Sequence, residues 1–259
     1  MTYLDNIIAF HRQRAASDGR SIDELRERVD STPRRGFVRA LLQGNHLSVI
    51  AEIKRRSPSK GDIDSNLDPA ALASDYLAGG AACLSVLTDE PHFGGSTNDL
   101  ATARAAVQLP VLRKDFTVCA NDVLDARLMG ADALLLIAAA LNDVELKKLH
   151  ALAEEIGLDV LVEVHDLDEL DRALNIGAKL VGVNQRDLHT FEVDMHRAAQ
   201  LGERIPSSVV AVAESGITGA DDAQRCAQAG YRAILVGEHL VRSANRAMAL
   251  KQLQVALPS

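Results

Sequence analysis

The chain has 259 residues, of which 47% are hydrophobic and 25% are charged. This composition excludes general disorder, and a single α/β barrel of roughly 250 residues would use the whole length. The formal net charge of −8 argues against broad electrostatic attachment to nucleic acid, because such binding relies on many Lys and Arg side chains.

The first residues carry no signal for export. They lack a basic segment followed by an apolar one, and no uncharged apolar run reaches the roughly 18 residues that a membrane span needs. We therefore expect a cytoplasmic protein that binds neither membrane nor nucleic acid, and we expect it to be a monomer or a weak homo-oligomer.

Residues 1–47 precede the first predicted strand and contain two helix-like stretches, 4–15 and 22–29. We interpret them as an N-terminal helical extension of one domain, whose main part covers residues 48–259. Such an extension could cover the bottom of a barrel or lie near its mouth, and the sequence leaves both open.

From residue 48 onward, short runs rich in Val, Leu and Ile alternate with longer amphipathic stretches, which is typical of βαβ units. Capping patterns mark the helices between them, such as Asp68-Pro69 at a start and Gly130 at an end. An open doubly wound sheet would share this alternation, but eight units without GxGxxG after the first strand favour a closed (β/α)₈ TIM barrel. The predicted strands are 48–53, 82–87, 110–112, 133–137, 160–164, 180–183, 209–212 and 233–236.

Polar residues follow five of these runs, at the barrel end where active sites form. Because strand residues alternate in direction, Glu52 and Lys54 point the same way, as do Asn184 and Arg186. Together with Lys114, Glu163 and Glu214, they predict a charged mouth suited to acid–base chemistry on an anion. This chemistry requires neither a metal nor an organic cofactor.

Glycines follow the seventh and eighth strands, where barrels frequently bind phosphate through backbone N–H groups. We expect Gly216, Gly237 and Glu238 to bind phosphate in this way, with the Glu238 carboxylate turned aside. The basic segment 54–61 is predicted to be a flexible loop that captures an anionic substrate and closes over it.

The remaining residue types carry less information. Aromatic residues make up 3% of the chain, yet Phe93 and Phe116 fall on predicted active-face loops, where they could contact an aromatic ring or anchor the loops. The three cysteines and eight histidines show no disulfide framework and no metal-ligand spacing. We therefore predict no metal and no cofactor.

Taken together, the motifs closely resemble the indole-3-glycerol phosphate synthase family of tryptophan biosynthesis. They occur in order as AEIKRRSPSKG (51–61), SVLTD (85–89), FGG (93–95), VLRKDF (111–116), LVEVH (161–165), NQRDL (184–188) and ESGI (214–217). The resemblance implies a carboxy-lyase that converts 1-(2-carboxyphenylamino)-1-deoxyribulose 5-phosphate into indole-3-glycerol phosphate, carbon dioxide and water.

The resemblance also implies individual roles. Lys114 would be the general acid of ring closure and Glu163 the acid or base of dehydration, with Glu52, Lys54 and Asn184 as further catalytic residues. The implied substrate-binding residues are Ser57, Phe93, Phe116, Leu135, Arg186, Leu188, Glu214 and Ser215.

Two alternatives remain at this point. Phosphoribosylanthranilate isomerase has similar phosphate loops, but that family uses a Cys at the end of the first strand, where this chain has Glu52 and Lys54. A catalytically idle barrel that only binds phosphate would be expected to lack a charged catalytic residue. None is missing.

Overall fold

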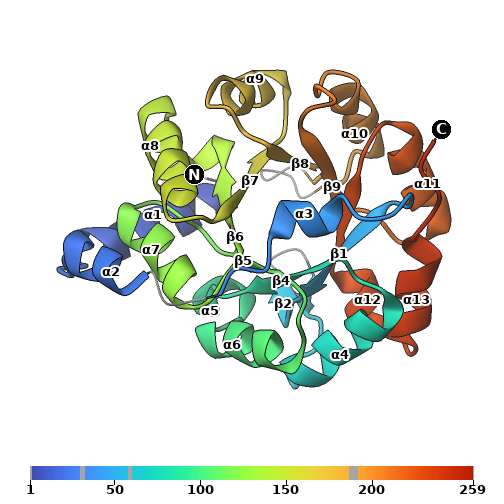
Figure 1. The fold of residues 1–259 in the computed structure, drawn as a ribbon, viewed down its shortest axis with the longest axis horizontal. Coiled ribbons are helices and arrows are strands. Elements are labelled where there is room, and N and C mark those ends of the chain that lie inside the picture. Colours follow the sequence, from blue (N-terminus) through green and yellow to red (C-terminus); the bar gives the residue numbers. More distant parts are fainter. Residues whose placement is uncertain (1, 30–32, 58–59, 187–191, 259) are drawn as a thin grey trace.

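The computed structural model describes residues 2–29, 33–57, 60–186 and 192–258. Eight parallel strands form a closed barrel surrounded by helices (Figure 1), which confirms the predicted (β/α)₈ fold. The barrel strands are β1 Ser48–Ile53, β4 Cys83–Leu87, β5 Val111–Lys114, β6 Ala133–Ile137, β7 Asp159–Val164, β8 Leu180–Asn184, β9 Val210–Glu214 and β10 Ala233–Val236.

Helices follow the strands around the barrel. They are α4 Pro69–Gly79, α5 Glu90–Phe93, α6 Thr97–Ala106, α7 Ala120–Leu128, η2 Ala138–Ala140, α8 Asp143–Glu155, α9 Leu167–Asn175, α10 Met195–Gly202, α11 Ala220–Gln228, α12 Glu238–Arg242 and α13 Arg246–Leu253. Their starts and ends agree with the sequence signals. Asp68 caps α4 with Pro69 in its first turn, and Asn142 and Glu145 form a capping box on α8. Gly130, with a φ of 87°, follows Met129, the C-cap of α7.

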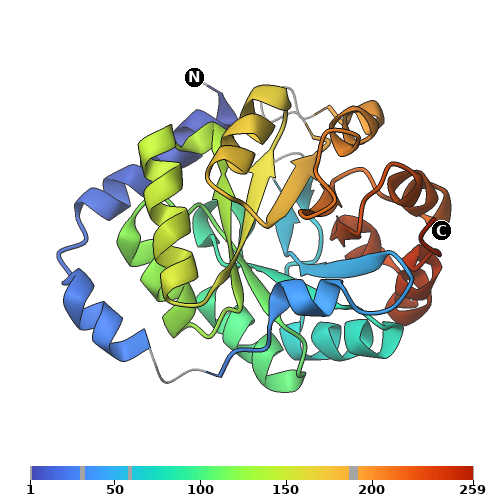
Figure 2. The ribbon, with the colours of Figure 1, turned by 45° about the horizontal axis from the view of Figure 1, so that its top comes forward.

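Before β1, the described residues contain the helices α1 Tyr3–Ala16, α2 Ile22–Arg28 and α3 Phe37–Leu41. The sequence predicts the first two but not α3. Figure 2 shows α1 and α2 running along one side of the barrel beside α7 and α8. The ion pairs Arg12–Glu145, Arg14–Asp122 and Arg20–Asp125 fasten α1 and the turn after it to this side.

The extension serves both ends of the barrel. Phe37 and Leu41 of α3 are fully buried and pack with Ile50, Leu112 and other side chains inside the barrel. At the opposite end, α1 contributes lining residues to the cavity described below. The sequence left open whether the extension lies at the bottom of the barrel or near its mouth. In the structure, α3 lies at the bottom and α1 reaches the mouth.

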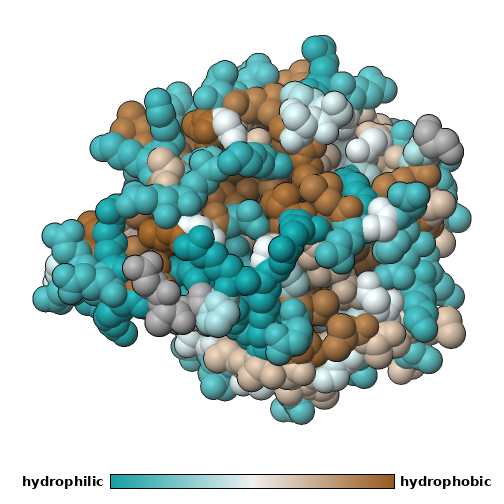
Figure 3. Space-filling view, in the orientation of Figure 1, coloured by the Kyte–Doolittle hydropathy of each residue, from teal (hydrophilic) through white to brown (hydrophobic). Residues whose placement is uncertain are grey.

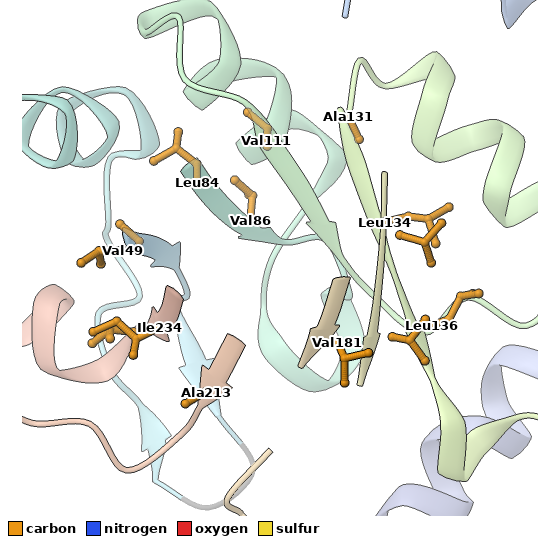
Figure 4. Packing of buried hydrophobic residues seen from close by; sticks show 14 of the residues in the cluster. Val49, Leu84, Val86, Val111, Ala131, Leu134, Leu136, Val181, Ala213 and Ile234 are labelled. Atoms are coloured by element: carbon orange, nitrogen blue, oxygen red, sulfur yellow. The ribbon is translucent and has the colours of Figure 1, made fainter. Parts of the chain in front are cut away.

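The hydrophobic core has two layers because successive strand residues point in opposite directions. Val49, Val86, Leu134 and Val181 belong to the large layer between the strands and the helices (Figure 4). A smaller group fills the barrel interior and consists of Phe37, Leu41, Ile50, Cys83, Leu112, Ala133, Leu135, Ile137, Leu161, Leu180, Val210, Val212, Ala233 and Leu235.

The predicted ends of three strands need correction. Strands β5, β8 and β9 run further than their apolar residues, so that Lys114, Asn184 and Glu214 lie within strands rather than after them. Parallel pairing uses backbone groups only, so a charged side chain does not end it when the side chain has a polar cavity to enter. Lys114 pairs with Leu87, and Asn184 pairs with Glu214.

The segment after β1 contains a short pair of strands that the sequence did not predict. Arg56–Ser57 (β2) and Gly61–Asp62 (β3) form a short antiparallel hairpin, with Ser57 opposite Gly61. Residues 58 and 59 of the predicted loop lie outside the described residues.

The surface in the orientation of Figure 1 is mixed. Hydrophilic side chains cover much of it, and apolar patches lie between them (Figure 3). Within the described part of the chain, no helix has the length and apolar character needed to cross a membrane.

Candidate active site

A cavity of about 580 Å³ opens at the carboxyl ends of the barrel strands. Every described residue that the sequence predicts for the site lines it, while Leu188 lies outside the described residues. Those lining residues are Glu52, Lys54, Ser57, Phe93, Lys114, Phe116, Leu135, Glu163, Asn184, Arg186, Glu214, Ser215, Gly216, Gly237 and Glu238.

The charged residues continue the interior rows of the barrel. Leu112 lies in the apolar interior and Lys114 follows two residues later, just as Glu163 follows Leu161 and Glu214 follows Val212. A spacing of two residues keeps the side-chain direction. The cavity floor is therefore apolar, and its walls become charged one step higher.

Lys114 is the central cation of the cavity. Its Nζ lies 3.4 Å from Glu163 Oε2 and 3.8 Å from Glu214 Oε2, and its side chain is 17% exposed. Burial alone would lower the pKa of Lys114, but the charges of Glu163, Glu214 and Glu52 outweigh it and raise the pKa above its ordinary value. Lys114 therefore carries its proton at neutral pH and points it into the cavity.

Glu163 has polar neighbours on several sides. Its Oε1 accepts a hydrogen bond from Asn184 Nδ2 at 3.1 Å, and His165 Nε2 lies 3.5 Å from the same oxygen. Burial favours the neutral acid, yet Lys114 and His165 together with the hydrogen bonds lower the pKa of Glu163 below its ordinary value. Glu163 is thus the ionised carboxylate beside Lys114.

Glu214 has the opposite charge state. Burial and the neighbouring charge of Glu163 raise the pKa of Glu214 to about 8, although Lys114 acts against them. Two buried carboxylates close to one cation titrate as a pair, and here the first proton resides on Glu214. The cavity therefore holds a protonated acid and an ionised base side by side at neutral pH.

The Glu214 proton predicts a dependence of stability on pH. Its pKa is 4.5 in an unfolded chain and about 8 in the fold, so between these values only the folded state keeps the proton and stability falls as pH rises. Replacing Glu214 by Gln should flatten this fall. Urea unfolding between about pH 5 and about pH 8 measures how the free energy of unfolding changes with pH. The exposed substitution Glu203→Gln is the control. If the free energy of unfolding of Glu214→Gln falls with pH as steeply as that of the wild type, the proton does not reside on Glu214.

Glu52 and Lys54 form the second charged pair. Lys54 Nζ lies 2.6 Å from Glu52 Oε1, and Ser85 Oγ donates to Glu52 Oε2 at 3.4 Å. This contact confirms that the two side chains share a direction. Of the neighbouring cations, Arg55 turns away to pair with Asp99, so only part of the basic segment faces the cavity.

Asn184 connects the charged wall with the loop after β9. Its Oδ1 accepts hydrogen bonds from Ser215 Oγ at 2.8 Å and from the Arg186 backbone N–H at 3.0 Å. Ser215 has a φ of 70°, a left-handed conformation that side chains other than Gly rarely adopt. Gln185 is fully buried and donates to the Ser215 carbonyl at 2.8 Å, which holds this backbone in place.

The opposite wall is aromatic and apolar. Phe93 and Phe116 lie with their ring centroids 6.1 Å apart, and Leu135 lies near the floor. Sequence reasoning missed that Tyr3, Leu4 and Ile7 of α1 also line the cavity. Tertiary packing brings them there. The sequence predicts the helix but does not show where on the barrel it packs.

The rim after β9 and β10 contains the predicted phosphate residues. Gly216 has a φ of 76°, and a Cβ there would also approach Val193 and Met195 closely. Glu238 begins α12, whose first N–H groups have no partner within a helix, and its carboxylate pairs with Arg242 Nε at 3.4 Å. Arg242 also lines the cavity and was not predicted.

Gly182, in the interior of β8, is a second residue that sequence reasoning missed. A Cβ on this residue would overlap Glu214 Oε1, so the missing side chain makes room for that carboxylate. A glycine inside a strand is the available signal, because it often marks such a close approach.

The Gly182→Ala substitution should therefore displace Glu214. We expect a large fall in kcat and only a moderate fall in the free energy of unfolding. Overpacking of this kind typically costs about 1–3 kcal/mol. Steady-state kinetics and thermal unfolding measure the two effects, with Gly219→Ala, where nothing lies within 4 Å of the added Cβ, as the matched control. Wild-type kcat in Gly182→Ala would show that Glu214 does not depend on this space.

A family model described as indole-3-glycerol phosphate synthase matches residues 4–253. The chain belongs to the indole-3-glycerol phosphate synthase family. The protein of that name from Nocardioides sp. is 47% identical over 257 residues, covering 98% of both chains. Indole-3-glycerol phosphate synthase 1 of Streptomyces coelicolor is 48% identical over 259 residues, covering 99% of this chain and 96% of the relative.

Solved structures support the fold at lower similarity. A thiamine phosphate pyrophosphorylase from Pyrococcus furiosus has a TM-score of 0.61 at 18% identity and covers 80% of this chain and 93% of its own. An N-acetylmannosamine-6-phosphate 2-epimerase from Clostridium perfringens has a TM-score of 0.59 at 15% identity, covering 74% of this chain and 86% of its own. Membership of the indole-3-glycerol phosphate synthase family makes the chain an enzyme, a carboxy-lyase of tryptophan biosynthesis.

Proposed function

We propose that this cavity performs the family reaction with Lys114 as the acid of ring closure and Glu163 as the catalyst of dehydration. The reaction converts 1-(2-carboxyphenylamino)-1-deoxyribulose 5-phosphate into indole-3-glycerol phosphate, carbon dioxide and water. The observation that carries the assignment is one buried ammonium group in contact with two carboxylates whose pKa values are shifted in opposite directions. Pairs of this kind are typical of acid–base catalysis.

In the first step, Lys114 donates a proton to the ketone oxygen of the sugar chain. The ring carbon that bears the carboxylate attacks the carbonyl carbon, so that one carbon–carbon bond forms and the ketone becomes a hydroxyl group. The carboxylates around Lys114 then offer a route for reprotonation. Glu214, which holds a proton at neutral pH, is 3.8 Å away.

Decarboxylation follows without a further acid. The bond to the carboxylate breaks, its electrons return to the ring, and carbon dioxide leaves. Lys54 is suited to binding the substrate carboxylate before this step, because it lines the cavity next to Glu52 and carries the cation that an anionic group requires.

Dehydration completes the pyrrole ring. The new hydroxyl leaves as water while a proton leaves the neighbouring carbon, so this step needs an acid and a base close together. The neighbouring side chains of Glu163 and Glu214 can provide the acid and the base. We assign the principal role in dehydration to Glu163, which also accepts a hydrogen bond from Asn184. Glu52 and Asn184 hold the reacting hydroxyl and amine.

The substrate ends have matching subsites. Phe93, Phe116 and Leu135 form an apolar wall for the aromatic ring, and Leu188 is assigned to the same contact from outside the described residues. The backbone N–H groups of Gly216, Gly237 and Glu238 bind phosphate at the opposite rim. The sugar chain of the substrate lies between the aromatic ring and the phosphate. It is positioned by Ser57, Arg186 and Ser215, and Glu214 lines the cavity beside it.

The setting of the enzyme is part of the proposal. Residues 1–47 and 48–259 act as one domain, since α1 supplies part of the cavity wall. The enzyme works in the cytoplasm as a monomer or weak homo-oligomer, without nucleic acid, membrane or cofactor.

The direct experiment supplies purified protein with the carboxyphenylamino substrate. Indole absorbance and fluorescence should develop, and carbon dioxide should appear in equal amount. A catalytically idle barrel would bind the substrate without producing either signal, and that result would overturn the proposed function.

A further inference from the structure

Two histidines and an aspartate meet beside the catalytic cavity, where α1 crosses the loop after β4. His11 comes from α1, Asp89 caps α5, and His92 lies within α5. One ligand-capable atom from each residue lies within 4.8 Å of the other two. The proposed reaction uses none of these side chains, and none of them lines the cavity.

The arrangement is close to that of a metal site. Asp89 Oδ2 lies 2.8 Å from His92 Nδ1 and 3.7 Å from His11 Nε2. Ligands about 2.0–2.2 Å from a tetrahedral zinc ion stand about 3.4 Å apart, a value between these two distances. The 2.8 Å contact is a hydrogen bond in the metal-free protein, and a bound ion would replace it and move these two atoms slightly apart.

His11 supplies an independent observation. Its residue exposure is 5%, and neither ring nitrogen has a hydrogen-bond partner within the described residues. A buried imidazole without a partner loses the hydrogen bonds that it makes in water. Its Nε2 lies 3.7 Å from Asp89 Oδ2 and therefore faces the cluster.

Asp89 supplies the charge. Its side chain is fully buried, and both of its ion-pair contacts in the described part of the chain are to the two histidines. As the cap of α5, this carboxylate also accepts a hydrogen bond from the His92 backbone N–H at 3.3 Å. A divalent ion bound between the three groups would place an opposite charge directly beside the buried carboxylate.

We propose that His11 Nε2, Asp89 Oδ2 and His92 Nδ1 bind one divalent transition-metal ion of the zinc type. Two imidazoles and one carboxylate suit zinc or cobalt, whereas Mg²⁺ and Ca²⁺ prefer sets of oxygen ligands. A water molecule takes the fourth position.

The ion has a structural role, because it fastens the N-terminal extension to the barrel mouth. Its ligands come from α1 and from the turn that ends in Phe93, and the His11 ring lies 5.2 Å from the ring of Phe116. Both Phe93 and Phe116 line the cavity. The bound metal therefore stabilises the aromatic wall without touching the substrate.

The test titrates Zn²⁺ alone into the full chain after treatment with a chelator. Calorimetry should give one equivalent for the wild type, and His11→Phe and His92→Phe should each weaken binding by more than about tenfold. Zn²⁺ should also raise the thermal midpoint of the wild type and slow hydrogen exchange in α1. Neither effect is expected in His11→Phe.

His150→Phe is the matched control, because His150 is also buried beside a carboxylate, at 3.7 Å from Glu154, but lies on α8. Its Zn²⁺ affinity should equal that of the wild type. Absence of binding to the wild type, or equal affinity in His11→Phe, would overturn the proposal and leave a metal-free contact between Asp89 and its histidines.

A second measurement avoids substitutions altogether. Addition of Co²⁺ to the wild type should shift the ring proton signals of His11 and His92 in NMR spectra and leave those of His150 in place. Shifts confined to other histidines would exclude this cluster as the site. Because both measurements omit substrate, their outcome is separate from that of the proposed catalytic function.

Discussion

Lys114→Met should lower kcat by about 10²–10⁴, the usual contribution of a general acid, while the substrate still binds. The substitution removes the ammonium group that faces Glu163 and Glu214 and keeps much of the side-chain volume. Steady-state assays give kcat, and calorimetry with the slowly converted substrate gives the dissociation constant.

Lys147→Met is the control, since Lys147 is exposed on α8. Its kcat should remain that of the wild type. Because loss of Lys114 leaves Glu163 and Glu214 without the cation beside them, circular dichroism must show that the variant is folded. A folded Lys114→Met enzyme with wild-type kcat would reassign the acid.

Glu163→Gln should also lower kcat by about 10²–10⁴, but at a later step. The amide keeps the size and shape of the side chain and loses its ability to accept or deliver a proton. Ring closure and decarboxylation should continue, because Lys114 remains beside it. The hydroxylated precursor of the indole should then accumulate.

Mass spectrometry of quenched reactions detects this precursor, which is heavier than the product by one water molecule. Glu203→Gln, an exposed change after α10, should accumulate none. If kcat falls in Glu163→Gln without the precursor, Glu163 acts before dehydration.

Hydrophobic periodicity was sufficient to predict the barrel. All eight apolar runs became strands because each carries enough Val, Leu and Ile to bury one face inside the barrel and the other under the helices. Helix α3 could not be predicted in this way. It has five residues, and its two buried side chains matter only because they close the bottom of an assembled barrel.

Much of the candidate active site could be predicted from the same alternation. Alternation along a strand gives the direction of Lys114 and Glu163 once the strand is identified. It does not give distances between strands, so the opposite charge states of Glu163 and Glu214 emerge only from the closed barrel. The cluster of His11, Asp89 and His92 could not be predicted from the sequence, because His11 lies in the N-terminal extension and the other two residues follow β4.

The central claim is the division of labour between Lys114 and Glu163, and a single-turnover experiment with carboxyl-labelled substrate tests it most directly. Released carbon dioxide reports ring closure with decarboxylation, and indole fluorescence reports dehydration. We predict that Glu163→Gln releases carbon dioxide much faster than it forms indole, and that Lys114→Met is equally slow in both. Rapid release of carbon dioxide by Lys114→Met, or equal slowing of both signals in Glu163→Gln, would contradict this account.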